Sequence, residues 1–183
     1  MELSPTAKVI LGMIAFGKRT GYDIKQFVDK TARHFMAASY GQIYPELKRL
    51  EDGGLISGTD VPSGGRARTE YALTEAGHQA LRDWLAEDKE PLYELRDEGM
   101  LKLFFADNNP ERLVPNLKLM RERNERKLTQ LRSLVEEASH GPEGACLTLD
   151  LGIDLTQQLV DWCAAKEREL SNLKLNSVSS RED

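Results

Sequence analysis

Three apolar residues near the middle of the first half of the chain recur at intervals of four and three, which predicts a helix with one buried face: Ile43, Leu47 and Leu50. An S-x-x-Q capping box over residues 39–42 places the start of this helix near Tyr40. Pro45 lacks a backbone N–H and crowds the preceding turn, so we expect either a distorted first turn or a regular helix that begins near Tyr44. Gly53-Gly54 predicts a left-handed cap at its end.

The residues after this helix predict a β-hairpin. Two short strands are expected over residues 55–59 and 69–73. The connecting segment, residues 62–68, is rich in glycine and is expected to form a loop too long for a two-residue hairpin. No Lys-Ser or Lys-Thr pair follows its glycines, so the loop does not match a phosphate-binding P-loop.

Caps and apolar periodicity predict three further helices in the first half of the chain. Ser4 begins one that ends near Phe16, and Thr20 begins a second over residues 21–33. Thr74 begins the third. The expected apolar side of this third helix consists of Ala76, Leu81, Trp84 and Leu85.

Beyond a polar boundary at residues 87–91 the pattern is helical throughout. Helices are expected over residues 92–106, 110–138 and 146–173, with a flexible tail at 177–183. The middle helix carries a heptad seam with two polar interruptions: Leu113, Leu117, Met120, Asn124, Lys127, Leu131, Leu134 and Ala138. Such a seam fits either a helix of a second subunit or a helix bundle within one chain. The expected apolar side of the last helix consists of Leu151, Leu155, Leu159, Trp162 and Leu170.

These elements together predict a mainly α fold. Residues 1–88 are expected to form a winged helix-turn-helix of three to four helices and a two-stranded wing. Residues 89–176 are expected to form an all-helical dimerisation domain.

The predicted central helix and the hairpin carry side chains that can reach DNA. The polar helix face holds Gln42, Tyr44, Lys48 and Arg49, and the hairpin tip holds Arg66 and Arg68. A glutamine can pair with adenine, and a lysine or arginine with guanine or phosphate. The tip arginines are expected to enter the minor groove or to contact phosphates. Alternatively, Lys48 and Arg49 belong to a solvated face, and Tyr44 packs on the wing.

Composition narrows the class of protein. A net charge of −5 over 183 residues argues against a general nucleic-acid coating protein. It does not exclude a sequence reader, because the first 88 residues are near neutral, with 11 basic and 12 acidic side chains. No apolar run has the length of about 20 residues that a membrane span needs, and no signal peptide is recognisable. Cys146 and Cys163 are expected to be reduced core residues of a cytoplasmic protein.

The sequence carries no recognisable catalytic motif. G-x-S-x-G, H-E-x-x-H and paired-cysteine metal patterns are absent. The three histidines, His34, His78 and His140, are scattered. We therefore expect no enzyme, no metal and no cofactor.

Four segments resemble the PadR family of bacterial transcriptional regulators. They are ILGMIAFGKRTGYDIKQF, SYGQIYPELKRLEDGGLI, GGRARTEYALTEAGHQALRDWL and RDEGMLKLFFAD, and the similarity extends over nearly the whole chain. The resemblance is to the subfamily with a long C-terminal helical domain. It implies a homodimeric repressor whose winged domains bind a palindromic operator and whose C-terminal helices pair. By resemblance the DNA contacts fall on Tyr40, Gln42, Tyr44, Lys48 and Arg66.

The resemblance also implies regulation by a small molecule, because some family members respond to phenolic acids. Met36 and Gly99 depart from the usual family pattern, so the ligand class does not carry over. The candidate pocket, expected between the two domains, is formed by Trp84, Phe104, Phe105 and Trp162. The candidate dimer contacts are Leu113, Leu117, Met120, Asn124, Leu131, Leu155 and Leu159.

The sequence thus predicts a repressor that binds operator DNA as a homodimer and is released by a small aromatic effector. A helical protein-interaction module that binds no DNA is the alternative. Charge reversal at Lys48 and Arg66 distinguishes the two, because only a DNA-binding protein would lose affinity for its own upstream DNA.

Overall fold

The computed structural model describes residues 2–30, 42–63, 66–90 and 95–179. The chain divides into two compact units, Met1–Pro91 and Leu92–Asp183.

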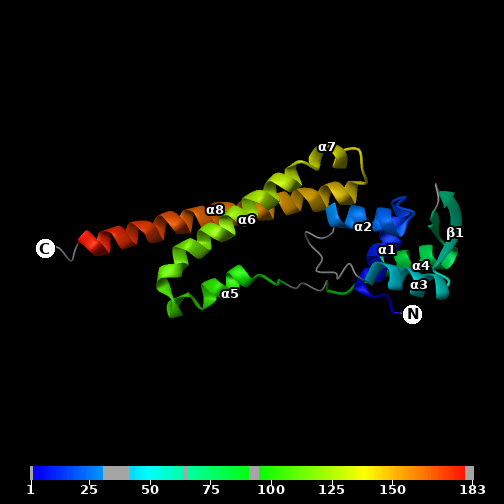
Figure 1. Cartoon of the computed structure of the whole chain (residues 1–183), viewed down its shortest axis with the longest axis horizontal. Helices are drawn as coiled ribbons and strands as arrows, with labels where there is room; N and C mark the ends of the chain where they lie inside the picture. The colour runs from blue at the N-terminus through cyan, green and yellow to red at the C-terminus, as the bar shows by residue number, and fades with distance from the viewer. Residues whose placement is uncertain (1, 31–41, 64–65, 91–94, 180–183) are drawn as a thin grey trace. The chain divides into compact units, whose positions relative to one another are not determined.

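The first unit consists of helices around one apolar core, with a β-hairpin (Figure 1). The helices are α1 (Pro5–Ala15), α2 (Gly21–Lys30), α3 (Ile43–Asp52) and α4 (Glu75–Leu85), and the strands are β1 (Ile56–Ser63) and β2 (Arg66–Leu73). The buried core consists of Ala7, Ile10, Leu11, Ile14, Ile24, Val28, Ile43, Leu47, Leu50 and Ile56. The face of α3 predicted to be apolar is therefore the face that anchors this helix.

Side-chain caps begin three of these helices. Ser4 Oγ accepts a hydrogen bond from the Ala7 N–H at 3.0 Å, and Thr20 Oγ1 accepts one from the Asp23 N–H at 3.0 Å. Thr74 Oγ1 accepts one from the Gly77 N–H at 3.0 Å. Each bond satisfies an N–H that lacks a partner in the first helical turn. The three predicted starts are confirmed.

The α3 helix begins at Ile43, so Pro45 lies in its first turn, where an N–H has no intrahelical acceptor. This agrees with the later of the two expected starts. The predicted capping box over residues 39–42 and the start near Tyr40 fall mostly outside the described residues. The predicted left-handed cap is confirmed at Gly54, with φ +70°, and the Leu55 N–H donates to the Leu50 carbonyl at 2.9 Å.

The two strands form a longer hairpin than predicted. They pair in antiparallel register from Ile56 opposite Leu73 to Ser63 opposite Arg66. The expected loop over residues 62–68 is wrong, because only residues 64 and 65 separate the strands. Pro62 is tolerated because both strands of a two-stranded sheet are edges, where a missing N–H donor need not break a ladder.

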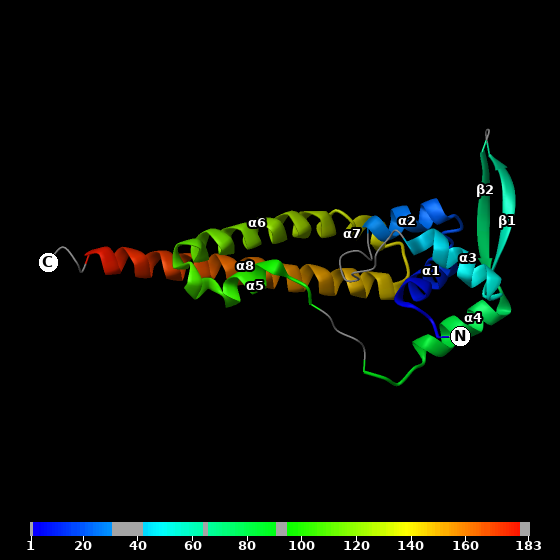
Figure 2. The same ribbon diagram turned by 60° about the horizontal axis from the view of Figure 1, so that its bottom comes forward.

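The second unit is helical throughout the part that the structure describes. It consists of α5 (Glu98–Phe104), the 3-10 turns η3 (Ala106–Asn108) and η4 (Pro110–Arg112), α6 (Leu113–Arg132), α7 (Val135–Ala138) and α8 (Glu143–Ser179). The long helices α6 and α8 lie side by side in both views (Figures 1 and 2).

Helix boundaries in this unit differ from the prediction at several places. The α5 helix begins only at Glu98, capped by the Asp97 side chain, which accepts from the Gly99 N–H at 2.8 Å. The predicted helix over residues 110–138 is interrupted after Arg132, and α7 follows as a separate turn. The last helix continues to Ser179, beyond the expected end near residue 173 and into the tail predicted to be flexible.

The heptad seam of α6 packs against α8 of the same chain. Leu117, Met120, Leu131 and the polar Asn124 are buried in this seam. The Asn124 Nδ2–H donates to the Met120 carbonyl at 2.8 Å, which satisfies one of its buried donors. Of the two alternatives for the seam, the structure has the bundle within one chain.

Four of the five residues on the predicted apolar side of α8 are exposed in the single chain, and the fifth, Leu170, packs against the buried core of this unit. The exposed fractions are 60% for Leu151, 58% for Leu155, 41% for Leu159 and 48% for Trp162. The side turned inward instead carries the small or polar residues Gly152, Thr156 and Cys163. Small side chains let two helices approach closely, and the Leu131 Cδ1 lies 3.7 Å from the Cβ position at Gly152.

Candidate nucleic-acid interface

The outer face of α3 presents three of the predicted contact residues to solvent. Gln42, Tyr44 and Lys48 are exposed, whereas the opposite face of the helix is buried in the core. The Lys48 amine makes no ion pair with another residue that the structure describes. The α2 and α3 helices are in contact, which gives the helix-turn-helix pairing its geometry.

Tyr44 is positioned by a glycine on α2. A Cβ atom at Gly21 would lie 2.8 Å from the Tyr44 Cε1 and 3.1 Å from the Leu47 Cδ1, so a side chain there would displace the ring. The ring remains 59% exposed. Its contact with Gly21 indicates that Tyr44 is held against α2 while part of its surface stays accessible.

Sequence reasoning missed Tyr22, which follows Gly21 and is 64% exposed. Its position outside the apolar stripe of α2 was the available signal. It adds a second exposed tyrosine to the first unit.

The side chain of Arg49, a predicted DNA contact, is paired with a carboxylate on the same helix. Its Nε–H donates to Glu46 Oε2 at 3.0 Å and its Nη2–H to Glu46 Oε1 at 2.6 Å. The pKa of Glu46 is lowered, chiefly by these bonds from Arg49, so the carboxylate stays ionised. The side chain of Glu46 is only 13% exposed, whereas that of Arg49 is 42% exposed.

The wing carries the remaining predicted contacts. The backbone of Arg66 pairs opposite Ser63 at the end of the hairpin, as expected for a tip residue, and its side chain lies outside the described part of the structure. The exposed Arg68 forms an ion pair with Glu70 at 2.6 Å on the same strand. Tyr40 lies outside the described residues.

Backbone contacts fix the wing relative to α3. The Gly58 N–H on β1 donates to Glu51 Oε1 on α3 at 2.9 Å. The Tyr71 N–H on β2 donates to the Arg19 carbonyl at 2.7 Å, and burial raises the pKa of the Tyr71 hydroxyl. The hairpin is therefore tied to α3 and to the segment before α2.

The predicted dimer contacts divide into two groups. Leu117, Met120, Asn124 and Leu131 are buried inside the second unit, so their packing is accounted for by α8 of the same chain, and Leu113 is half-buried. Leu155 and Leu159 are exposed. The exposed group continues along α8 as a row that we call the α8 apolar stripe: Leu147, Leu151, Leu155, Leu159 and Trp162.

Of the predicted effector-pocket residues, Phe104 and Phe105 are in contact, with ring centroids 4.9 Å apart at an interplanar angle of 88°. They are 80% and 56% exposed. Trp84 belongs to the first unit, where the Lys8 Nζ lies 5.4 Å from its ring centroid. The pocket itself stays a prediction.

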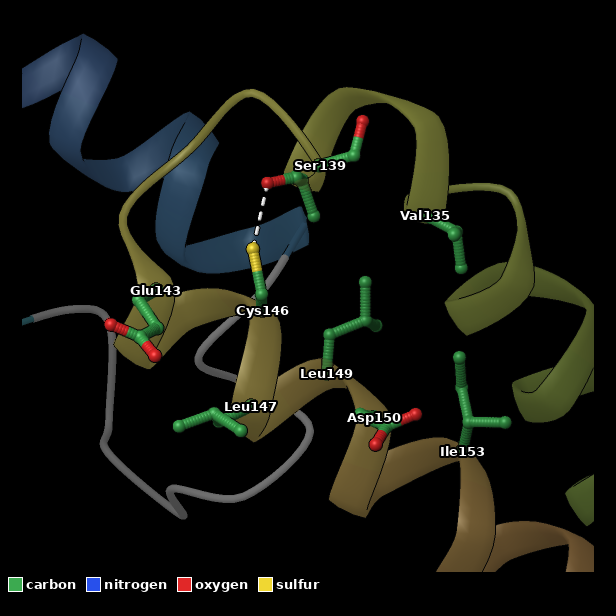
Figure 3. A pocket seen from close by; sticks show the side chains of 9 residues that line it. Val135, Ser139, Glu143, Cys146, Leu147, Leu149, Asp150 and Ile153 are labelled. Carbon is green, nitrogen blue, oxygen red and sulfur yellow. Dashed lines mark hydrogen bonds between the residues drawn. The ribbon is translucent and has the colours of Figure 1, made fainter.

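A cavity of about 320 Å³ lies elsewhere in the second unit (Figure 3). Its lining consists of Val135, Ala138, Ser139, Glu143, Cys146, Leu147, Leu149, Asp150 and Ile153, and includes none of the four predicted pocket residues. The Cys146 thiol donates to the Ala138 carbonyl at 2.9 Å across one side of it.

The described part of the chain holds no group of three or more His, Cys, Asp or Glu side chains arranged to bind a metal ion. None of its helices is long and apolar enough to cross a membrane.

A helix-turn-helix with an exposed polar recognition face and a braced β-hairpin defines the winged-helix class of DNA-binding proteins. Comparison with known proteins agrees. Residues 10–83 match the transcriptional regulator PadR-like family, and residues 95–171 match the C-terminal domain of virulence activator alpha. The negative transcriptional regulator PadR of Bacillus subtilis (strain 168) is 30% identical over 164 residues, which cover 84% of this chain and 90% of that protein.

Solved structures give the same result. The crystal structure of Bacillus subtilis PadR in complex with operator DNA has a TM-score of 0.78 and 28% identity, covering 88% of this chain and 96% of that one. The crystal structure of the same protein in complex with p-coumaric acid has a TM-score of 0.72 and 27% identity, covering 90% and 97%. This chain belongs to the PadR-like family of transcriptional regulators, and the relatives named above are regulators and not enzymes.

Proposed function

We propose that this regulator is a repressor that binds a palindromic operator as a homodimer. In each subunit α3 enters the major groove, with Gln42, Tyr44 and Lys48 toward the DNA, and the two α3 helices lie about 34 Å apart in successive grooves. The arginines of the wing contact the flanking minor groove or phosphates. The observation that carries this proposal is the α3 face, whose polar side chains are exposed while the opposite side is fixed in the core.

The second subunit is proposed to cover the α8 apolar stripe. Its five large apolar side chains recur at intervals of four and three, so they form one continuous row on the helix. Two of its leucines, Leu155 and Leu159, are members of the predicted dimer contact. A row of this size is typical of a protein–protein interface.

The effector is proposed to be a small aromatic acid. The support is the structure of the Bacillus subtilis relative with p-coumaric acid. The ligand need favour one arrangement of the dimer by only about 1–3 kcal/mol to change operator occupancy.

DNA footprinting upstream of the protein's own gene tests the regulator. Two protected half-sites related by a two-fold axis are expected, and release of both by one member of a panel of aromatic acids is expected for the effector. Binding measured against salt should lose about one unit of slope for each phosphate contact removed, as in K48E or R66E. The matched control is K118E, which reverses an exposed lysine on α6. Equal affinity of K48E, R66E and the wild type would contradict the proposed contacts.

Solution mass tests the homodimer. The double substitution L151E/L155E places two charges in the α8 apolar stripe, and we expect the mass to fall from two chains to one. Leu85 is 69% exposed on α4, so L85E adds a charge at an equally exposed leucine outside the stripe and should leave the mass unchanged. A wild-type mass of one chain would refute the dimer.

A further inference from the structure

Glu46 links the start of the first unit to the DNA-facing helix. The Ser4 hydroxyl, which caps α1, donates to Glu46 Oε1 at 2.7 Å across 42 positions of sequence. The same carboxylate receives both bonds from Arg49, one turn further along α3. Because Glu46 is largely buried and its acceptor oxygens are occupied, its side chain has one defined orientation.

The contact with Glu46 uses one edge of the Arg49 guanidinium. That edge consists of Nε and Nη2, which bond the two carboxylate oxygens as a fork. The Nη1 group and the second proton of Nη2 form the other edge, which makes no hydrogen bond with a described residue. Arg49 thus keeps a second pair of parallel donors, on a side chain that is 42% exposed.

A pair of parallel N–H donors matches the O6 and N7 acceptors of guanine in the major groove. An arginine that swings freely must lose its rotamer freedom to make this contact, whereas one already held by a carboxylate loses less. We propose that Glu46 is a positioning residue that holds Arg49 in place to read a guanine, with Ser4 holding Glu46 in turn. This inference rests on the proposed function, in which α3 enters the major groove.

The inference predicts opposite effects on two kinds of binding. Glu46 carries a negative charge on a helix that approaches phosphates, so it weakens sequence-independent affinity. E46Q removes that charge and the charge-assisted fork. Sequence-independent affinity should therefore rise, while preference for guanine at the Arg49 position should fall. A residue that only stabilises the fold would lower both together.

The experiment selects binding sites from a random DNA library with the full-length protein, then measures affinity for the selected site and for its variants. E46Q should lower the discrimination between guanine and the other bases at one position per half-site by about tenfold. R49K should lower it equally, because lysine cannot form a fork, and E46Q/R49K should add nothing further. S4A should relax the preference in the same direction, and S4T, which keeps the hydroxyl, should restore it.

The matched control is Glu75 on α4, which pairs with Arg82 at 3.0 Å on a surface apart from α3. E75Q removes a similar ion pair and the same charge, so it should leave the base preference unchanged. The melting temperature of every variant distinguishes a loss of folded protein from a loss of base discrimination.

The outcomes distinguish the two proposals. If the wild type selects a site and E46Q selects the same site with unchanged discrimination, Glu46 does not position Arg49, and the proposed function stands. Parallel loss of specific and non-specific affinity in E46Q also overturns the inference, since it assigns Glu46 to stability alone. A wild-type protein that selects no DNA sequence overturns both.

Discussion

Gly77 is the residue whose substitution has the most direct structural consequence. It lies in the first turn of α4, is buried, and a Cβ atom there would lie 1.9 Å from the Leu55 carbonyl oxygen and 3.0 Å from its carbonyl carbon. Real Cβ atoms essentially never approach a heavy atom closer than 3.0 Å. Because the obstacle is backbone, G77A requires α4 to move by about 1 Å relative to the start of the wing.

This movement acts on the bonds that hold α4 to the wing. The Thr74 N–H donates to the Leu55 carbonyl at 3.1 Å, and the Thr74 hydroxyl donates to the Gly54 carbonyl at 2.7 Å. Loss of two such bonds costs about 1 kcal/mol each, and overpacking costs about 1–3 kcal/mol. Alanine recovers about 1 kcal/mol through its better helix propensity. We expect a net loss of about 2–4 kcal/mol in the free energy of unfolding of the first unit.

Tryptophan fluorescence can follow this unit alone. Trp84 belongs to the first unit and Trp162 to the second, so urea unfolding in a W162F background reports on α4. A loss of 2 kcal/mol corresponds to a melting temperature lower by about 10 °C for a unit of this size.

Gly12 provides the control, because it lies inside α1 and a Cβ there meets no atom within 4 Å. G12A should therefore stabilise the unit, by up to about 1 kcal/mol. If G77A unfolds at the same urea concentration as the wild type, or higher, the close approach of Leu55 to α4 does not constrain this position.

Three further predictions concern the second unit. Arg123 bonds both oxygens of Asp97 and lowers the pKa of that carboxyl, so Asp97 stabilises the fold above its unfolded pKa of about 4, and this contribution is lost as the pH falls through the lower folded value. The difference in urea stability between wild type and D97N, followed by Trp162 fluorescence in a W84F background, should be constant from pH 7 to 5 and shrink below about pH 4. A difference that grows in acid would contradict this role of Asp97. Cys163 is fully buried and burial raises its thiol pKa, so an aromatic disulfide reagent should label the partly exposed Cys146 in the native protein and Cys163 only on unfolding. Equal labelling rates for the two thiols in the native protein would contradict this prediction. L117A should lower the free energy of unfolding by about 2–5 kcal/mol, because Leu117 is 1% exposed. L151A should change the free energy of unfolding of the single chain by about 1 kcal/mol or less and weaken self-association instead. Similar losses in the free energy of unfolding for both variants would refute the division between the inner and outer sides of the helix pair.

Local sequence was sufficient to predict the starts of three of the four helices of the first unit. Ser4, Thr20 and Thr74 each bond an N–H three positions ahead, and Gly54 adopts the positive φ that ends α3. These features depend on atoms a few residues apart, so the residue types alone indicate them. The buried stripe of α3 was predictable for the same reason, since its spacing follows from the pitch of the helix.

Other features required the folded chain. The close approach of Leu55 to Gly77 and the placement of Tyr44 beside Gly21 join residues from different elements. The sequence identified Arg49 as a candidate for DNA contact, and its partner Glu46 lies three residues before it on the same helix. The hydrogen bond from Ser4 to Glu46, by contrast, requires α1 and α3 to be placed together. The longer wing likewise depended on cross-strand pairing, which extends the strands past Pro62.

The second unit shows most clearly which features follow from the sequence and which require the tertiary structure. Periodicity by itself determined that α6 and α8 have apolar sides, because side-chain direction repeats with the helical turn. Only the tertiary structure decided that α6 packs on the side of α8 with Gly152 and Cys163, which leaves the leucine side of α8 exposed. The physical reason is that burial of any apolar helix face lowers the free energy of the folded state, whichever surface covers it. Which surface covers it depends on how closely the side chains of two helices can pack.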